Sequence, residues 1–288
     1  MNRGHFTALL ILLGVLAVGD CAAQDPLLWR ELDPANTVVM ETTEGTITLE
    51  LNPVFAPRTV EQFKKLVEDD FYRSLSFYRV IDGFVAQGGD ESDINVPNGQ
   101  PTLPPEFELK TSEELNWTPV QSNDLYAKET GFVDGFAAAR EGDITWLTHC
   151  PGVLAMARNT EPDTGSTDFY IVIGQSPRYL DRNLTIFGRV VHGMDVVQRI
   201  HRGKSEDNGI IERDEDRSRI LRMKMGNDVD GEKRKDVYVM DTNSPGFADY
   251  LAARKNRSDD FFHKKPPAVL DVCQVPVGSR LEKPSSPD

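Results

Sequence analysis

Residues 77–90 place a permanently charged arginine close to an aromatic ring and an amide side chain. Strand alternation separates Arg79 from its sequence neighbours, and Gly83 allows the chain to turn before Phe84 and Gln87. A guanidinium group stays protonated and carries five N–H donors, so it can stabilise an electron pair that develops on a bound group. The simpler interpretation is a surface arginine beside a core phenylalanine, and this segment alone leaves both open.

Three further sequence blocks favour the functional interpretation of Arg79, because they follow the first block in a specific order. The first block ends in GFVAQGGD at residues 83–90, and it is followed by PGVLAMAR at 151–158, TDFYI at 167–171 and YLDRNLTIFGRV at 179–190. Together they resemble the signature of the cyclophilin-type peptidyl-prolyl cis-trans isomerases across residues 36–201. The resemblance implies an enzyme that accelerates rotation of X-Pro bonds.

The chemistry of this rotation explains why a site for it would contain an arginine. The barrier is about 18–20 kcal/mol because the amide must lose its resonance. In the twisted transition state the proline nitrogen becomes pyramidal and gains a lone pair that can accept a hydrogen bond. A fixed donor aimed at that nitrogen binds the twisted amide better than the planar one, as catalysis requires. Arg79 is the candidate donor, and we expect no metal and no cofactor.

The resemblance also implies a set of site residues. It assigns catalysis to Arg79, Phe84 and Gln87, and substrate binding to Met156, Ala157, Arg158, Asp168, Phe169, Tyr170, Tyr179, Leu180 and Leu184. An apolar seat for the proline ring is expected from Phe84, Met156, Tyr170 and Leu180, and a hydrogen bond to the substrate backbone from Gln87. Two departures predict retained but weak or narrowed activity. Asp168 stands where the family usually has Gln, with Arg158 and Arg79 as alternative ionic partners, and Leu184 stands where many members have His.

The elements that must position these residues are mostly short strands. Alternating residues at 37–40 and 46–51 predict a hairpin that turns at Gly45, and the apolar spacing at 57–67 predicts a helix with Pro57 in its first turn. Further strands are predicted at 76–80, 84–88, 144–147, 153–157, 169–173, 185–190, 220–225 and 237–240, and helices at 196–200 and 247–262. Residues 91–142 are rich in proline and lack long apolar runs, which predicts a long loop region. This pattern favours a mainly β fold, and the resemblance implies a closed antiparallel barrel capped by two helices.

We therefore expect three parts. They are a signal peptide at 1–23, a cyclophilin-like barrel domain at 24–240 with an insertion at 91–142, and a C-terminal helical or irregular extension at 241–288.

Composition restricts the partners. The chain has 288 residues, of which 39% are hydrophobic and 27% charged, so it is long enough for a substantial core and too apolar for a disordered chain. Its formal net charge of −14 argues against nucleic acid as a partner. The expected partners are X-Pro segments of unfolded or extended client proteins, and we expect the chain to be a monomer.

Residues 1–23 resemble a secretory signal. Arg3 precedes an apolar run at 6–18 that is too short to span a membrane, and small residues end at Ala23. An uncleaved anchor and lipidation of Cys21 are the alternatives. After cleavage we expect no stable membrane insertion and a periplasmic location, where Cys150 and Cys273 are candidates for a disulfide. Two separate buried thiols are the alternative to that pairing.

Other functions remain as rivals. The serious one is a catalytically weak cyclophilin-like module that binds proline segments as a chaperone or scaffold. The DTGS motif at 163–166 matches aspartic proteases, but a second motif of this kind is missing and the mechanism needs two carboxylates. His149 next to Cys150 suggests a thiol nucleophile, for which a disulfide or core role is the better interpretation.

Overall fold

The structure of the protein is a computed structural model that describes residues 28–91, 101–229 and 236–281. The predicted signal peptide at 1–23 lies outside the described residues, as do residues 92–100 of the predicted loop region. Within the described ranges, no helix has the length and apolar character needed to cross a membrane.

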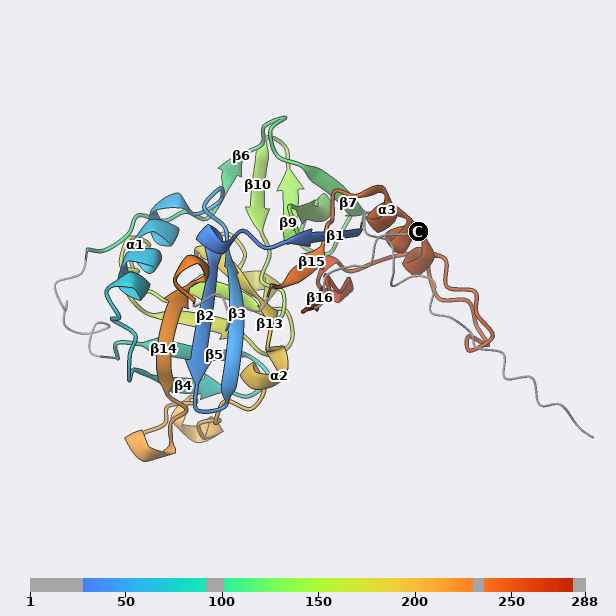
Figure 1. Cartoon of the computed structure of the whole chain (residues 1–288). Helices are drawn as coiled ribbons and strands as arrows, with labels where there is room; N and C mark the ends of the chain where they lie inside the picture. Colours follow the sequence, from blue (N-terminus) through green and yellow to red (C-terminus); the bar gives the residue numbers. More distant parts are fainter. Residues whose placement is uncertain (1–27, 92–100, 230–235, 282–288) are drawn as a thin grey trace, which may run out of the picture.

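An antiparallel eight-stranded sheet forms the body of the molecule (Figure 1). In sheet order its strands are β14 (Ile220–Met225), β2 (Thr37–Thr42), β3 (Gly45–Leu51), β13 (Ile186–His192), β11 (Val153–Met156), β12 (Phe169–Val172), β5 (Val85–Gly89) and β4 (Ser76–Ile81). The two outer strands meet because Ser76 pairs with Arg219 and the Phe77 N–H donates to the Ser218 carbonyl at 3.0 Å. These contacts close the sheet, so the predicted closed antiparallel barrel is confirmed.

The barrel interior is built from the residues that alternation predicts. Val38, Met40, Ile47 and Leu49 on the β2–β3 hairpin are fully buried. The hairpin turns at Gly45, whose φ of +137° disfavours any residue with a side chain. Two helices, α1 (Pro57–Glu68) and α2 (Met194–Val197), contribute buried apolar residues to the same core.

The N-terminus of α1 is capped from a distant segment. Its N-cap residue Ala56 has no side chain that can accept a hydrogen bond. Instead, the carboxylate of Glu106 accepts from the backbone N–H groups of Arg58 at 3.0 Å and Thr59 at 2.9 Å. A negative charge at this end of a helix is also favoured by the helix dipole. The segment that enters the insertion therefore helps to hold a barrel helix.

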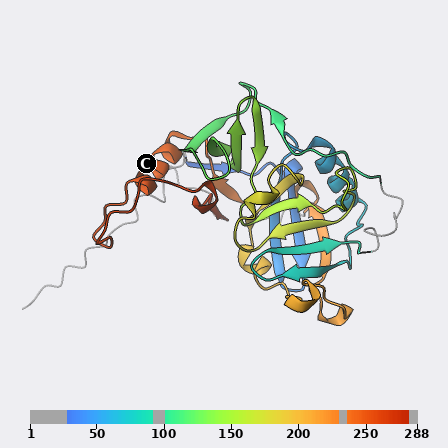
Figure 2. The same ribbon diagram turned by 180° about the vertical axis from the view of Figure 1, so that it is seen from behind.

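The prediction of a long loop region at 91–142 is wrong for most of this segment. Residues 109–147 form a second antiparallel sheet of β6 (Leu109–Lys110), β10 (Ile144–Leu147), β9 (Phe136–Glu141), β8 (Glu129–Val133) and β7 (Trp117–Ser122), in that order. Its buried residues include Val120, Phe132 and Ala138. The inserted sheet stands at one end of the barrel (Figures 1 and 2).

The C-terminal segment packs against the inserted sheet. The helix α3 (Pro245–Lys255) brings Phe247 edge-on to Phe132, with 5.5 Å between ring centroids. This helix ends at Lys255, seven residues before the predicted end, because Asn256 leaves the helical conformation. A small sheet of β1 (Trp29–Glu31), β15 (Tyr238–Met240) and β16 (Ser279–Arg280) joins both ends of the described chain.

A disulfide also holds the C-terminal segment in place. Cys150, which precedes β11, is bonded to Cys273 with an S–S distance of 2.04 Å. The cysteines are separated by 123 residues in sequence. The predicted disulfide is thus present in the structure, and it attaches the C-terminal segment to the barrel.

Replacing Cys273 with serine should lower the free energy of unfolding by about 2–5 kcal/mol, because the unfolded chain is freed from a long closed loop. Urea unfolding of the oxidised protein and the variant measures this loss. Reductant should destabilise the original protein and leave the variant unchanged. Equal stability of the original protein with and without reductant would contradict the expectation.

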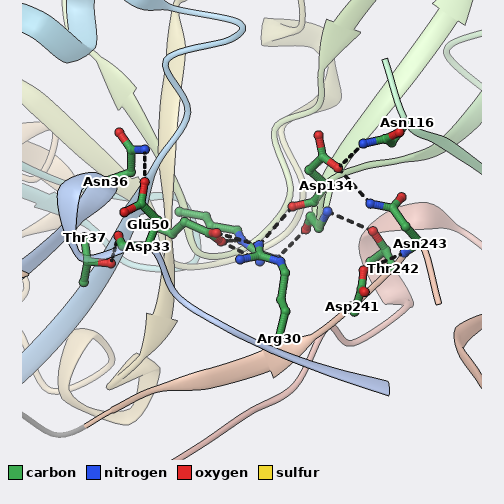
Figure 3. A network of polar contacts seen from close by, with 12 residues as sticks. Arg30, Asp33, Asn36, Thr37, Glu50, Asn116, Asp134, Asp241, Thr242 and Asn243 are labelled. Carbon is green, nitrogen blue, oxygen red and sulfur yellow. Dashed lines mark hydrogen bonds and ion pairs between the residues drawn. The ribbon is translucent and has the colours of Figure 1, made fainter. Parts of the chain in front are cut away.

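A buried ionic junction connects the barrel to the inserted sheet (Figure 3). The carboxylate of Glu50 on β3 accepts from Arg30 at 2.5 Å and from Arg189 at 2.7 Å. Both guanidinium groups also donate to the turn between β8 and β9, Arg30 to the Asp134 carbonyl and Arg189 to the Gly135 carbonyl. Burial lowers the pKa of Arg189, and the charge of Glu50 opposes this effect.

The same turn holds the C-terminal segment. The Asp134 carboxylate accepts from Asn116 at 3.0 Å and from Asn243 at 2.8 Å, and the Gly135 N–H donates to the Thr242 hydroxyl at 2.9 Å (Figure 3). Barrel, inserted sheet and C-terminal segment therefore meet at one polar junction.

Candidate active site

A row of side chains crosses four neighbouring strands of the barrel. Strand register places Arg79 on β4 opposite Gln87 on β5, Gln87 opposite Tyr170 on β12, and Tyr170 opposite Ala155 on β11. Directly opposed residues share one face of a sheet. The fold thus brings a cation, an amide and an aromatic ring from two sequence blocks to one surface.

Arg79 is half-buried and held from two sides. Its Nη1 donates to Oε1 of Gln87 at 3.0 Å, and its Nε donates to the backbone carbonyl of Asn208 at 3.2 Å. A longer contact of 3.4 Å joins Nη2 to the side-chain oxygen of Asn208. Since a guanidinium group has five N–H donors, two have no hydrogen-bond partner among the described residues. Asn208 is a site residue that the sequence motifs did not indicate.

Gln87 continues this hydrogen-bond network from Arg79 into the protein interior. It is 8% exposed, and its Nε2 donates to the Tyr78 hydroxyl at 2.6 Å. The Tyr78 hydroxyl in turn donates to the carboxylate of Asp168. Burial and the charge of Asp168 raise the pKa of Tyr78, which therefore remains a protonated donor. The second N–H of the Gln87 amide has no hydrogen-bond partner among the described residues.

Alternation alone could not find Tyr78. In a regular strand Tyr78 and Arg79 point to opposite faces, but the register shifts between Ser76 and Arg79. At this irregularity both side chains reach Gln87. The same contacts identify a partner for Asp168 that the sequence did not suggest, the phenol of Tyr78 rather than a neighbouring arginine.

The expected apolar seat is assembled in part. Tyr170 is 5% exposed, and the half-buried side chains of Phe84, Ala157 and Leu184 pack against the same apolar cluster. Met156 is 4% exposed and belongs to the barrel core beneath it. Leu180 is half-buried in the helical turn Arg178–Leu180, from which Tyr179 is largely exposed.

A small cavity joins several predicted residues next to this surface. It has a volume of about 30 Å³ and is lined by Gln87, Ala157, Arg158, Asn159, Thr164, Ser166 and Asp168. The guanidinium of Arg158, one of the lining residues, is held by backbone carbonyls. It donates to the backbone carbonyls of Asn159 at 2.7 Å, Thr160 at 2.9 Å and Asn183 at 2.8 Å. Arg158 therefore joins the loop at 159–160, next to the cavity, to the loop that carries Asn183.

Phe169 is corrected from a substrate-binding residue to a core residue. Its side chain is fully buried, and its ring lies edge-on to Phe63 and Phe77 with centroids 5.9 and 6.0 Å apart. Adjacent residues on a strand face opposite sides, so Phe169 points into the barrel while Tyr170 points outward. Its place in the motif reflects packing.

The arrangement offers hydrogen-bond donation beside an apolar surface. The described residues contain no cluster of His, Cys, Asp and Glu that could hold a metal ion. Cys150, the thiol that the sequence offered as a nucleophile next to His149, is consumed by the disulfide. The described groups of this surface suit the binding of a polar group next to an apolar one.

Comparison with known proteins gives a consistent result. The family described as cyclophilin type peptidyl-prolyl cis-trans isomerase/CLD matches residues 37–225. A probable peptidyl-prolyl cis-trans isomerase of Brucella suis is 30% identical over 191 residues, which cover 62% of this chain and 78% of the relative. Peptidyl-prolyl cis-trans isomerase-like 1 of Neurospora crassa is 34% identical over 166 residues, covering 58% and 81%.

A solved structure extends the likeness beyond the barrel. The crystal structure of cyclophilin AquaCyp293 from Hirschia baltica is similar with a TM-score of 0.72 and 30% sequence identity. The similarity covers 89% of this chain and 94% of that chain. This share is larger than the part that the family match spans.

Proposed function

The chain belongs to the cyclophilin-type peptidyl-prolyl cis-trans isomerases, and we propose that Arg79 performs its catalysis by stabilising the twisted X-Pro amide. The enzyme class follows from the family and the relatives. The residue-level mechanism rests on one observation, the row of Arg79, Gln87 and Tyr170 across three neighbouring strands.

The proposed roles follow from this row. Gln87 holds Nη1 of Arg79 at 3.0 Å and Asn208 holds Nε and Nη2, and the two N–H groups without a partner among the described residues can donate to the proline nitrogen. Tyr170, Phe84 and Leu184 supply an apolar seat for the proline ring. Because apolar walls exclude water, a hydrogen bond from Arg79 is stronger there than in solution. The donor is already in place, so little reorganisation is needed when the amide twists.

Exchange NMR on a short X-Pro peptide tests the proposed function. Added protein should speed the exchange between cis and trans resonances, whereas the free peptide interconverts over tens of seconds. Peptide binding without faster exchange would support the rival non-enzymatic binding module and overturn the proposed turnover.

We also propose that the enzyme acts on X-Pro segments of secreted client proteins in the periplasm. The signal-like sequence at 1–23 supports this location. The disulfide between Cys150 and Cys273 is a second support, because such bonds persist in oxidising compartments. Cell fractionation with N-terminal sequencing tests it, and an uncleaved chain in the cytoplasmic fraction would overturn it.

A further inference from the structure

A chain of buried polar groups lies behind Tyr170. The Tyr170 hydroxyl is 2.8 Å from Nε2 of His149, and Nδ1 of His149 is 3.1 Å from Oδ1 of Asp181. The other carboxylate oxygen of Asp181 accepts from Nε of Arg178 at 2.5 Å. His149 is fully buried, and the side chains of Asp181 and Arg178 are 7% and 4% exposed.

The ion pair between Asp181 and Arg178 guides the assignment of donors and acceptors in this network of polar groups. The Asp181 carboxylate is paired with Arg178, so we assign Nδ1 of His149 as the donor to Asp181. With this proton on Nδ1, Nε2 is assigned as the acceptor of the Tyr170 hydroxyl. Burial raises the pKa of Tyr170, which keeps its hydroxyl protonated. The His149 backbone N–H also donates to Asp181, at 2.8 Å, and fixes the loop that carries the ring.

We propose that His149 is a positioning residue, which holds the ring of Tyr170 in the orientation that seats the proline of the substrate. This inference rests on the proposed function, since it gives Tyr170 its place in the seat. The two rings lie nearly parallel, at 12°, with centroids 6.2 Å apart, and the hydrogen bond is made at the end of the Tyr170 side chain. On the neighbouring strand β5, Gln87 lies directly across from Tyr170.

The physical reason is the cost of an unpaired buried hydroxyl. Without His149 the Tyr170 hydroxyl would lose its acceptor, and a buried polar group without a partner costs about 1–3 kcal/mol. The ring would then turn or shift to bring its hydroxyl to water. Such a movement weakens the seat, which contacts the proline in both the planar and the twisted state. The expected kinetic effect is therefore mainly on KM, with a smaller effect on kcat.

His149 does not activate a nucleophile. Cys150, next to His149, is bonded to Cys273 and is not a free thiol. Both ring nitrogens of His149 are occupied by Asp181 and Tyr170. His149 therefore acts through Tyr170 and does not touch the reacting amide.

A double-mutant cycle tests the coupling. His149→Phe should raise KM for an X-Pro peptide about tenfold, within the usual range of coupling between contacting residues. The same replacement in the Tyr170→Phe background, where the hydroxyl is absent, should change KM less than about twofold. His149→Gln keeps an amide oxygen as acceptor and should recover most of the loss.

Phe247→Leu is the control for a general loss of stability, because Phe247 lies in the same apolar cluster but on α3. It should lower the unfolding temperature and leave KM unchanged. An equal effect of His149→Phe in both backgrounds, in protein that remains folded, would overturn the positioning role. Failure of the unmodified protein to speed exchange would instead overturn the proposed function.

Discussion

Replacing Arg79 with alanine should reduce kcat/KM for X-Pro isomerisation about 10²–10³-fold, the usual loss when one preorganised transition-state donor is removed. The planar amide offers its nitrogen no lone pair, so the contact exists only in the twisted state and its loss should appear in kcat. Exchange NMR measures the rate, and saturation with peptide separates kcat from KM.

The fold should survive this replacement. Arg79 is half-buried, and its partners Gln87 and Asn208 have other hydrogen bonds or solvent to replace it. Arg79→Lys keeps the charge but not the planar group, so it should recover only a small part of the rate. Arg73→Ala is a matched control, because Arg73 is an exposed arginine paired with Asp70 on the barrel surface. A change confined to KM, or loss of the folded state, would contradict the proposed role.

The second large effect is expected at the ionic junction. Glu50→Gln should lower the free energy of unfolding by about 3–5 kcal/mol, because it leaves the cations Arg30 and Arg189 without their shared carboxylate. The side chain of Arg189 is only 11% exposed, so water cannot replace the lost partner. For a protein of this size the unfolding temperature should fall by roughly 10 °C.

Glu41→Gln provides the control for this experiment. Glu41 lies on the neighbouring strand β2 and pairs with Arg222 at 2.8 Å, but both side chains are more than a third exposed. An exposed pair contributes about 0–1 kcal/mol, so its loss should hardly change the unfolding temperature. Calorimetry with the disulfide intact compares the two variants, and equal shifts would show that the junction contributes no more than a surface pair.

Local patterns predicted much of the barrel. The hairpin of β2 and β3 and the helix α1 were correct because their apolar residues follow one period and their turns carry Gly45 and Pro57. The predicted strands at 76–80 and 84–88 were enough to place Arg79 and Gln87 on neighbouring strands. These features depend on neighbours within a few residues, which a sequence displays directly.

Features that depend on distant partners escaped prediction. The inserted sheet was missed because its inner residues, Phe132 among them, are covered by α3 from much later in the chain. Tyr78 was missed because a register shift breaks alternation, and Asn208 because it lies 129 residues from Arg79. Phe169 was assigned to the substrate because a motif does not state which face of its strand each residue occupies.

The position of the disulfide has a consequence for the order of synthesis. The residues of the candidate site lie between Tyr78 and Asn208, whereas the second cysteine of the disulfide is Cys273. A chain made from its N-terminus completes the strands of the barrel before this cysteine emerges. The covalent closure is then the last event, and it locks a C-terminal segment onto a catalytic surface whose sequence is already complete.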